Sequence, residues 1–221
     1  MNYKWEDSQK SCQIELLTPE EFQRLYAEKF PRSFKGNELE QIRFCKADRF
    51  YQRVSGTFAK PLKEAPSAEQ IRNGYYMIED TLIFIENNGE VRRILDEMQG
   101  YQMTDITSAS LLLFDFMEYL IKDDMLYLQL YEEKLTQMEE MLLDGELKDF
   151  NRSLLEVRKD LSALSAYYEQ LSDVGETLQQ NAAELGDEQD KFLFGLYYER
   201  AERLYAMVQN LKEYSMQLRE M

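Results

Sequence analysis

The sequence contains no histidine, and only two cysteines and four prolines in 221 residues. Histidine is the commonest general base and the commonest zinc ligand, so a serine or cysteine nucleophile would lack its usual activating partner. Cys12 and Cys45 form no Cys-x-x-Cys pair, and their scarcity fits a reducing compartment, although spacing does not exclude one disulfide. Only carboxylate or lysine chemistry remains for catalysis, and no motif calls for it. We therefore predict that the chain is not an enzyme.

Long hydrophobic runs are also missing. No apolar stretch approaches the ~20 residues that a transmembrane helix needs. The polar N-terminus MNYKWEDSQKS has no signal-peptide character. The phosphate-binding, zinc-protease, serine-hydrolase and calcium-loop motifs are absent as well. As given, the chain is expected to be soluble and cytosolic.

Basic residues are outnumbered by acidic ones, 26 against 42, which gives a formal net charge of −16. Because phosphate binding depends on lysine and arginine, this charge disfavours nucleic acid and anionic membrane surfaces as partners. It is compatible with attraction of cations, but solubility alone would also explain it. The charge is uneven: residues 1–104 carry a net −2, residues 105–190 a net −15 and residues 191–221 a net +1. The composition therefore changes near residue 105.

Residues 1–106 are predicted to form an α/β domain with a central mixed sheet. A short strand is expected at 12–17, followed by a helix over 18–30 that opens with a capping box of Thr18 and Glu21 and ends at Pro31. Alternating apolar residues over 42–61 predict strand. The stretch 74–95 is interpreted as three short strands, with turns at Glu79-Asp80 and at Asn87-Asn88-Gly89, and a short helix follows from about Arg93 to Met98.

Residues 107–221 are predicted to form a helical domain, which makes the fold class α+β. Apolar residues three and four apart predict one helix over about 108–143 and an antiparallel one to about 181, together an acidic hairpin over 107–182. A long stalk helix is expected over 190–221, extending roughly 45 Å and projecting. Its heptad seam indicates either packing on a neighbouring helix or a self-associating coiled coil. The seam consists of Phe194, Tyr197, Ala201, Leu204, Val208, Leu211, Ser215 and Leu218.

Carboxylates are the only abundant functional groups, and they are the oxygen ligands that Mg²⁺ and Ca²⁺ prefer. Adjacent acids occur at 123–124, 132–133, 139–140 and 187–190. The simpler interpretation of such pairs is a solvated helix face. Asp124 differs because it lies in the apolar register of its helix, where a carboxylate needs a partner or access to solvent.

The order of these parts resembles the cytoplasmic part of CorA-like divalent-cation transporters. Residues 108–147 are similar to the first long acidic helix of that family. Residues 152–174, with Leu154, Arg158, Lys159 and Leu161, are similar to the returning helix, and 197–221 to the stalk helix that leads into the pore. Segments 45–58 and 78–95 are similar to the central strands. The transmembrane pair and the Gly-Met-Asn signature of the family are absent, so we expect a domain truncated before the membrane helices.

The resemblance implies a homo-oligomer, pentameric in the full-length family, at the cytoplasmic face of the cell membrane. It implies that cations bound between subunits hold the pore closed. Mg²⁺ is the implied regulatory ion, with Zn²⁺, Co²⁺ and Ni²⁺ left open. The stalk position of the regulatory acid falls on Gly195, so the implied metal ligands are the nearest acids, Asp190 and Glu199, with Glu38 or Glu40 as partners.

An alternative of another class remains at this point. A soluble coiled-coil scaffold could use the acidic hairpin to bind a basic partner protein.

Overall fold

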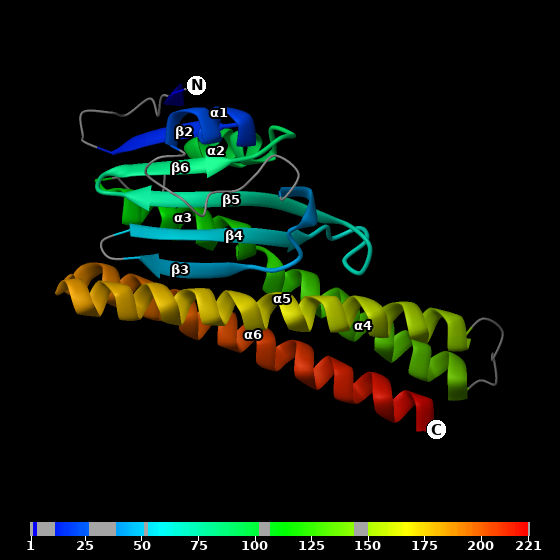
Figure 1. The fold of residues 1–221 in the computed structure, drawn as a ribbon. Coiled ribbons are helices and arrows are strands. Elements are labelled where there is room, and N and C mark those ends of the chain that lie inside the picture. The colour runs from blue at the N-terminus through cyan, green and yellow to red at the C-terminus, as the bar shows by residue number, and fades with distance from the viewer. Residues whose placement is uncertain are drawn as a thin grey trace.

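The protein is described by a computed structural model that covers residues 2–3, 12–26, 39–50, 53–101, 107–143 and 150–220. A six-stranded sheet lies beside a group of long helices (Figure 1). The strand order is β1-β2-β6-β5-β4-β3, and β2 pairs in parallel with β6 while all other neighbours are antiparallel. The strands are β1 (Asn2–Tyr3), β2 (Gln13–Leu17), β3 (Lys46–Phe50), β4 (Arg53–Pro61), β5 (Gln70–Ile78) and β6 (Thr81–Ile85). The predicted mixed sheet is confirmed.

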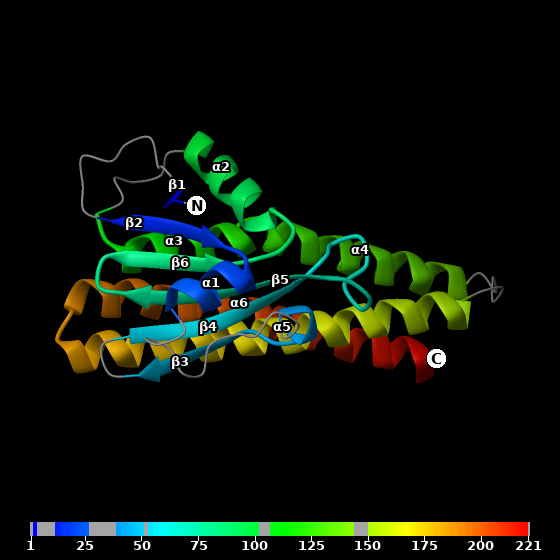
Figure 2. The same cartoon turned by 45° about the horizontal axis from the view of Figure 1, so that its top comes forward.

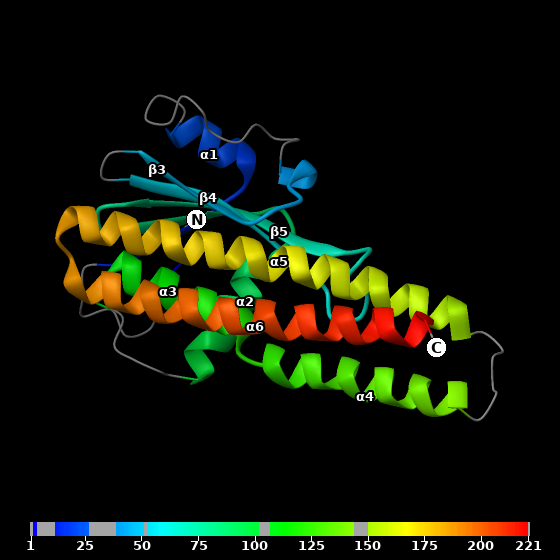
Figure 3. The same cartoon turned by 90° about the horizontal axis from the view of Figure 1, so that it is seen from below.

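The two faces of the sheet bury different aromatic side chains because successive residues of a strand point to opposite faces. On one face Phe22 of α1 (Pro19–Tyr26) stacks on Tyr76, with ring centroids 4.6 Å apart. On the other face Phe58 stacks on Tyr75 at 4.9 Å, and Phe84 meets Phe116 of α3 at 4.6 Å. Figure 3 shows the sheet between α1 and the helices α3, α5 and α6.

The start of α1 has the predicted capping box. The backbone N–H of Glu21 donates to Thr18 Oγ1 at 3.2 Å, and the N–H of Thr18 donates to Glu21 Oε2 at 3.0 Å. These bonds satisfy two N–H groups at the start of the helix that lack a helical partner. The predicted end at Pro31 lies outside the described residues.

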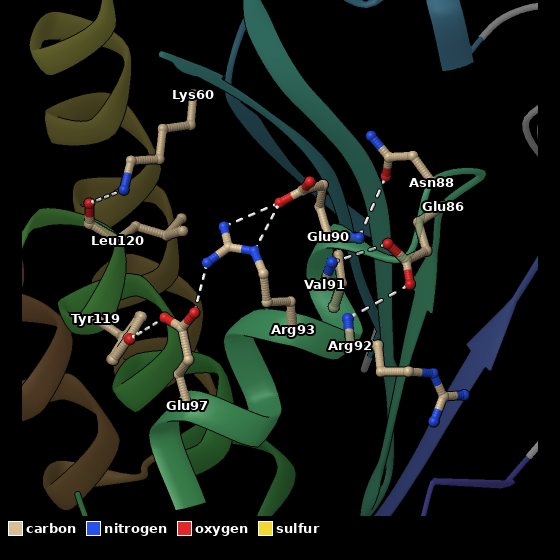
Figure 4. A network of polar contacts seen from close by, with 10 residues as sticks. All are labelled: Lys60, Glu86, Asn88, Glu90, Val91, Arg92, Arg93, Glu97, Tyr119 and Leu120. Carbon is tan, nitrogen blue, oxygen red and sulfur yellow. Dashed lines mark hydrogen bonds and ion pairs between the residues drawn. The ribbon is translucent and has the colours of Figure 1, made fainter. Parts of the chain in front are cut away.

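The prediction of three strands over 74–95 is wrong. Two strands, β5 and β6, meet at the Glu79-Asp80 turn, and the Asn87-Asn88-Gly89 segment leads into a helix. That helix, α2 (Glu90–Tyr101), is longer than predicted and begins where Glu86 accepts bonds from the N–H groups of Val91 and Arg92 (Figure 4). Because the Glu86 carboxylate accepts from two N–H groups of the first turn of α2, the Asn-Gly pair leads into a helix and not a hairpin.

Helix α2 is tied to α3 (Ala109–Ile121) through one glutamate, Glu97. Arg93 binds Glu90 and Glu97 of its own helix, and Glu97 Oε2 accepts from the hydroxyl of Tyr119 on α3 at 2.5 Å (Figure 4). The Lys122 ammonium lies 3.8 Å from the centroid of the Tyr119 ring. The hydrogen bond between Glu97 and Tyr119 joins α2 to α3, while the ion pairs of Arg93 lie within α2 and the cation–π contact lies at the end of α3.

The single helix predicted over 108–143 is interrupted. The structure has α3 (Ala109–Ile121) and α4 (Asp124–Leu143), separated at Lys122 and Asp123. No glycine or proline lies between them, so the local sequence carried no signal for the interruption. The next helix, α5 (Phe150–Leu185), ends at Gly186, whose φ of 75° terminates it about four residues beyond the predicted end near residue 181.

The last helix, α6 (Glu188–Glu220), lies antiparallel along α5 (Figures 1 and 3). All eight residues of its heptad seam are buried, which confirms the interpretation that the seam packs on a neighbouring helix of the same chain. A Cβ on Gly175 of α5 would lie only 3.0 Å from Tyr198 Cα, so the two backbones approach closely there. Helices α4, α5 and α6 extend beyond the sheet together, and the last helix is not a free stalk (Figure 2).

The fold class is α+β as predicted, and the long helices follow the sheet in the expected order. One cluster of buried side chains nevertheless runs from Ile14 of β2 to Leu218 of α6. The division into domains at residues 1–106 and 107–221 therefore stays a prediction.

Candidate functional site

The four predicted metal ligands lie on two elements or outside the described part of the chain. Glu38 lies outside the described residues. Glu40 lies in the short helix η1 (Leu39–Gln41), where its side chain is exposed and its carbonyl accepts from Arg43 Nη1 at 2.5 Å. Asp190 and Glu199 both belong to α6.

Asp190 is the more enclosed of the two α6 acids. Burial raises the pKa of its carboxyl, a hydrogen bond with Ser110 of α3 lowers it, and the charge of Asp187 raises it. Its N–H donates to Asp187 Oδ1 at 2.9 Å, which makes Asp187 the cap of the helix. A carboxyl whose charged form is disfavoured by burial gains from a nearby cation.

Glu199 has a different environment. Its carboxylate is largely exposed and lies 4.0 Å from Arg203 one turn later. Such an exposed pair contributes little stability, so Glu199 is free to exchange its arginine for another cation.

The structure does not bring the predicted ligands together within one chain. Asp190 and Glu199 are nine residues apart on α6, which places them about 13 Å apart along the axis and on opposite sides of the helix. Among the residues that the structure describes, no group of three or more cysteine, aspartate or glutamate side chains is arranged to hold a metal ion. A cation that uses either acid therefore needs ligands from elsewhere, such as a second copy of the chain.

Gly195 faces the partner helix. A Cβ at this position would lie 2.5 Å from Nε2 of Gln179 on α5. A longer side chain here would have to displace Gln179, so position 195 is a contact between helices and not an open ligand position.

The other acidic pairs are mostly solvated, as the simpler interpretation predicted. Asp123 and the pair Glu132-Glu133 are exposed. Glu139 accepts from the hydroxyl of Tyr214 on α6 at 2.6 Å, which joins α4 to α6. Glu188 pairs with Lys191 within the first turn of α6. These groups cap and connect helices.

Asp124 is the buried exception, and the prediction that it needs a partner is confirmed. Its side chain is 3% exposed, its Oδ1 lies 3.0 Å from Lys63 Nζ, and its Oδ2 accepts from the hydroxyl of Tyr168 at 3.1 Å. Sequence reasoning missed Lys63, which lies between β4 and β5, because no local pattern links it to a helix 61 positions later. The signal that existed was Asp124 itself, a carboxylate in an apolar register.

No helix within the described ranges is both long and apolar enough to cross a membrane.

The similarity of this chain to known proteins lies in its fold. No protein-family model and no curated protein sequence matches the chain. Solved structures do: the complete CorA magnesium transporter from Methanocaldococcus jannaschii superposes with a TM-score of 0.72 at 17% identity, over 99% of this chain and 70% of that one. The soluble domain of the same transporter gives a TM-score of 0.69 at 18% identity, over 91% of this chain and 82% of that one. The chain has the fold of the CorA soluble domain.

A further similar structure is also a cytoplasmic domain. The cytoplasmic domain of ZntB from Vibrio parahaemolyticus superposes with a TM-score of 0.69 at 12% identity, over 96% of this chain and 86% of that one. The CorA soluble-domain fold therefore occurs in proteins with more than one name.

Proposed function

We propose that this chain is the regulatory domain of a divalent-cation transporter, with Mg²⁺ as the regulating ion. The observation that carries the proposal is that a complete magnesium transporter superposes on 99% of this chain. The proposed role is non-enzymatic. In this proposal the domain works at the cytoplasmic face of the cell membrane, joined to membrane-spanning segments that its described helices do not supply.

The proposed cation site lies between copies of the chain. Asp190 and Glu199 point to opposite sides of α6, so each is available to a different neighbour in a closed ring. In this proposal Glu38 or Glu40 supplies the partner carboxylate from the α/β part. A Mg²⁺ ion bound between copies neutralises carboxylates that otherwise repel, and its loss drives the copies apart. The absence of histidine makes a dedicated Zn²⁺ site less suitable, while Co²⁺ and Ni²⁺ share the octahedral preference of Mg²⁺.

Helix α6 is suited to pass such a change along its length. Its seam is buried against α5, and Glu202 accepts a hydrogen bond from Ser172 of α5 while Arg200 pairs with Glu118 of α3. A displacement at Asp190 is therefore resisted by contacts with two other helices, and α6 moves as a stiff element. The fold gives no support to the alternative of a scaffold for a basic protein.

The test is sedimentation velocity and thermal unfolding of the chain with and without millimolar Mg²⁺. We expect Mg²⁺ to increase the sedimentation coefficient and the melting temperature, because an ion bound only by the assembled folded state stabilises it. Co²⁺, Ni²⁺ and Zn²⁺ are compared at the same concentration. The double variant Asp190→Asn with Glu199→Gln should lose the response.

A matched control removes two charges elsewhere. The exposed pair Glu132 and Glu133 on α4, changed to glutamine, should leave the Mg²⁺ response unchanged. If both double variants respond to Mg²⁺ as the unmodified chain does, the proposed ligands are wrong. If the unmodified chain itself shows no response, regulation by Mg²⁺ through this domain alone is refuted.

A further inference from the structure

The interruption between α3 and α4 is not explained by the residues at which it occurs. The apolar periodicity is continuous across 108–143, and Lys122 and Asp123 are compatible with helix. The backbone of Lys122 is helical, with φ −52° and ψ −37°, and the carbonyl of Asp123 already accepts from the N–H of Tyr127 at 3.0 Å. The cause of the interruption must therefore come from another part of the chain.

Lys60, at the end of β4, makes the first contact at this point. Its ammonium donates to the carbonyl of Leu120 at 2.6 Å (Figure 4). In a continuous helix that carbonyl would accept from the N–H of Asp124. A side chain inserted into the ladder of helical hydrogen bonds is one of the known causes of a kink.

Lys63, three residues further along, makes the second contact. It pairs with the buried carboxylate of Asp124, the first residue of α4, at 3.0 Å. Its ammonium also lies 5.2 Å from the centroid of the Tyr127 ring, and its carbonyl accepts from the Tyr127 hydroxyl at 2.9 Å. Two lysines from one segment therefore hold the last turn of α3 and the first turn of α4.

The same segment is anchored to a third helix. Ser67 Oγ donates to Asp160 Oδ1 of α5 at 2.6 Å, and Asp160 Oδ2 accepts from the hydroxyl of Tyr131 on α4 at 3.2 Å. We call residues 60–67 the β4–β5 strap. Through it, the sheet contacts α3, α4 and α5 at one place.

We propose that the β4–β5 strap is a clasp that holds the interruption between α3 and α4, and that Lys60 and Lys63 determine whether residues 109–143 form two helices or one. The inference does not depend on the proposed cation role. Burial lowers the pKa of Lys60 and the charge of Asp124 opposes this, which fits an ammonium kept in place by its partners. Release of the clasp would swing α4 relative to the sheet.

The direct test is the angle between α3 and α4, from backbone residual dipolar couplings of the whole chain in solution. The double variant Lys60→Met with Lys63→Met keeps unbranched side chains of similar bulk and removes both ammonium contacts. We expect α3 and α4 to join into one continuous helix, and the Asp124 amide to gain about tenfold protection from hydrogen exchange as it recovers a helical acceptor. The control is Lys159→Met on α5. This lysine is exposed, and its replacement removes one positive charge, as does each of the two substitutions in the strap.

An unchanged angle in a folded double variant would overturn the proposal. If the double variant does not fold, Lys60→Met alone decides, because it removes the contact with Leu120 and leaves the pair of Lys63 with Asp124 intact. The role of Lys60 would then be refuted if this single variant has the same angle between α3 and α4 as the unmodified chain and the same rate of hydrogen exchange at the Asp124 amide.

Discussion

Replacing Gly175 by alanine tests whether α5 and α6 are in backbone contact. The added Cβ would lie 3.0 Å from Tyr198 Cα, 3.1 Å from Tyr198 N and 3.2 Å from Tyr197 Cδ1. Ordinary contacts between carbon atoms lie near 3.5–4.0 Å. The nearest two atoms belong to the backbone of α6 and cannot rotate away, so the helices must separate by a few tenths of an ångström.

Two opposing effects determine how much Gly175→Ala changes the free energy of unfolding. Alanine is about 1 kcal/mol more favourable than glycine inside a helix. Overpacking of a well-packed contact costs about 1–3 kcal/mol. We therefore expect Gly175→Ala to lower the free energy of unfolding by about 1 kcal/mol.

The chain supplies two matched controls on other helices. A Cβ on Gly195 of α6 meets only the end of the flexible Gln179 side chain, and a Cβ on Gly100 of α2 meets nothing within 4 Å. Both controls should gain from the helix preference of alanine, by up to about 1 kcal/mol. The expected difference between Gly175→Ala and either control is about 2 kcal/mol.

The assay is urea unfolding followed by circular dichroism, with the midpoint and slope fitted for each variant. Equal slopes are required, since a changed slope would indicate a different unfolded or native state. If Gly175→Ala is stabilised as much as the two controls, the close contact between α5 and α6 does not exist and the reasoning fails.

Three further predictions concern individual groups. Asp124→Ala should cost about 2 kcal/mol in urea unfolding, because Tyr168 loses its acceptor while the partly exposed Lys63 can be solvated; a cost below that of exposed Glu132→Ala would contradict the buried pair. Thr18→Ala should lower the free energy of unfolding by about 1 kcal/mol through loss of the capping bond, and Thr18→Ser should keep most of that stability. Equal stabilities of all three proteins would show that the capping box contributes nothing. Burial raises the pKa of the Cys45 thiol from 9.0 to about 12, so its contribution to stability is complete below pH 9 and is lost at about 1.4 kcal/mol per pH unit as the pH rises from 9 to 12. Unfolding at pH 8, 9 and 10 should show a steeper decline for the unmodified chain than for Cys45→Ala, and equal slopes would disprove this.

Local signals predicted the parts of the fold that depend on neighbours in sequence. The capping box of Thr18, the alternation around Phe58 and the heptad seam of α6 each depend on residues within one or two turns or along one strand, and each is confirmed. The three-strand interpretation failed because Asn-Gly favours hairpins in general, while here Glu86 lies one residue before the turn and caps a helix. A carboxylate immediately before a helical pattern was the signal that could have corrected it.

The remaining errors have a tertiary cause. Lys60 and Lys63 contact the chain at the interruption between α3 and α4, and no pattern within 108–143 contains that information. The separation of Asp190 from Glu199, in contrast, follows from helical geometry and could have been worked out from their spacing alone. The placement of Gly195 against Gln179 required the crossing of α5 and α6, which a heptad pattern on one helix does not specify.

The position of β3 at the edge of the sheet limits which helices can move. An edge strand exposes unpaired N–H and C=O groups that invite edge-to-edge aggregation. Here α5 covers that edge: Gln170 accepts from the N–H of Cys45 at 2.8 Å, and Glu184 pairs with Arg49 at 2.7 Å (Figure 1). Detachment of α5 would therefore expose the edge of β3, to which a strand of another molecule could add. Helix α5 and the sheet must travel as one rigid body, α6 moves with them because its seam is buried against α5, and independent motion is left to α4.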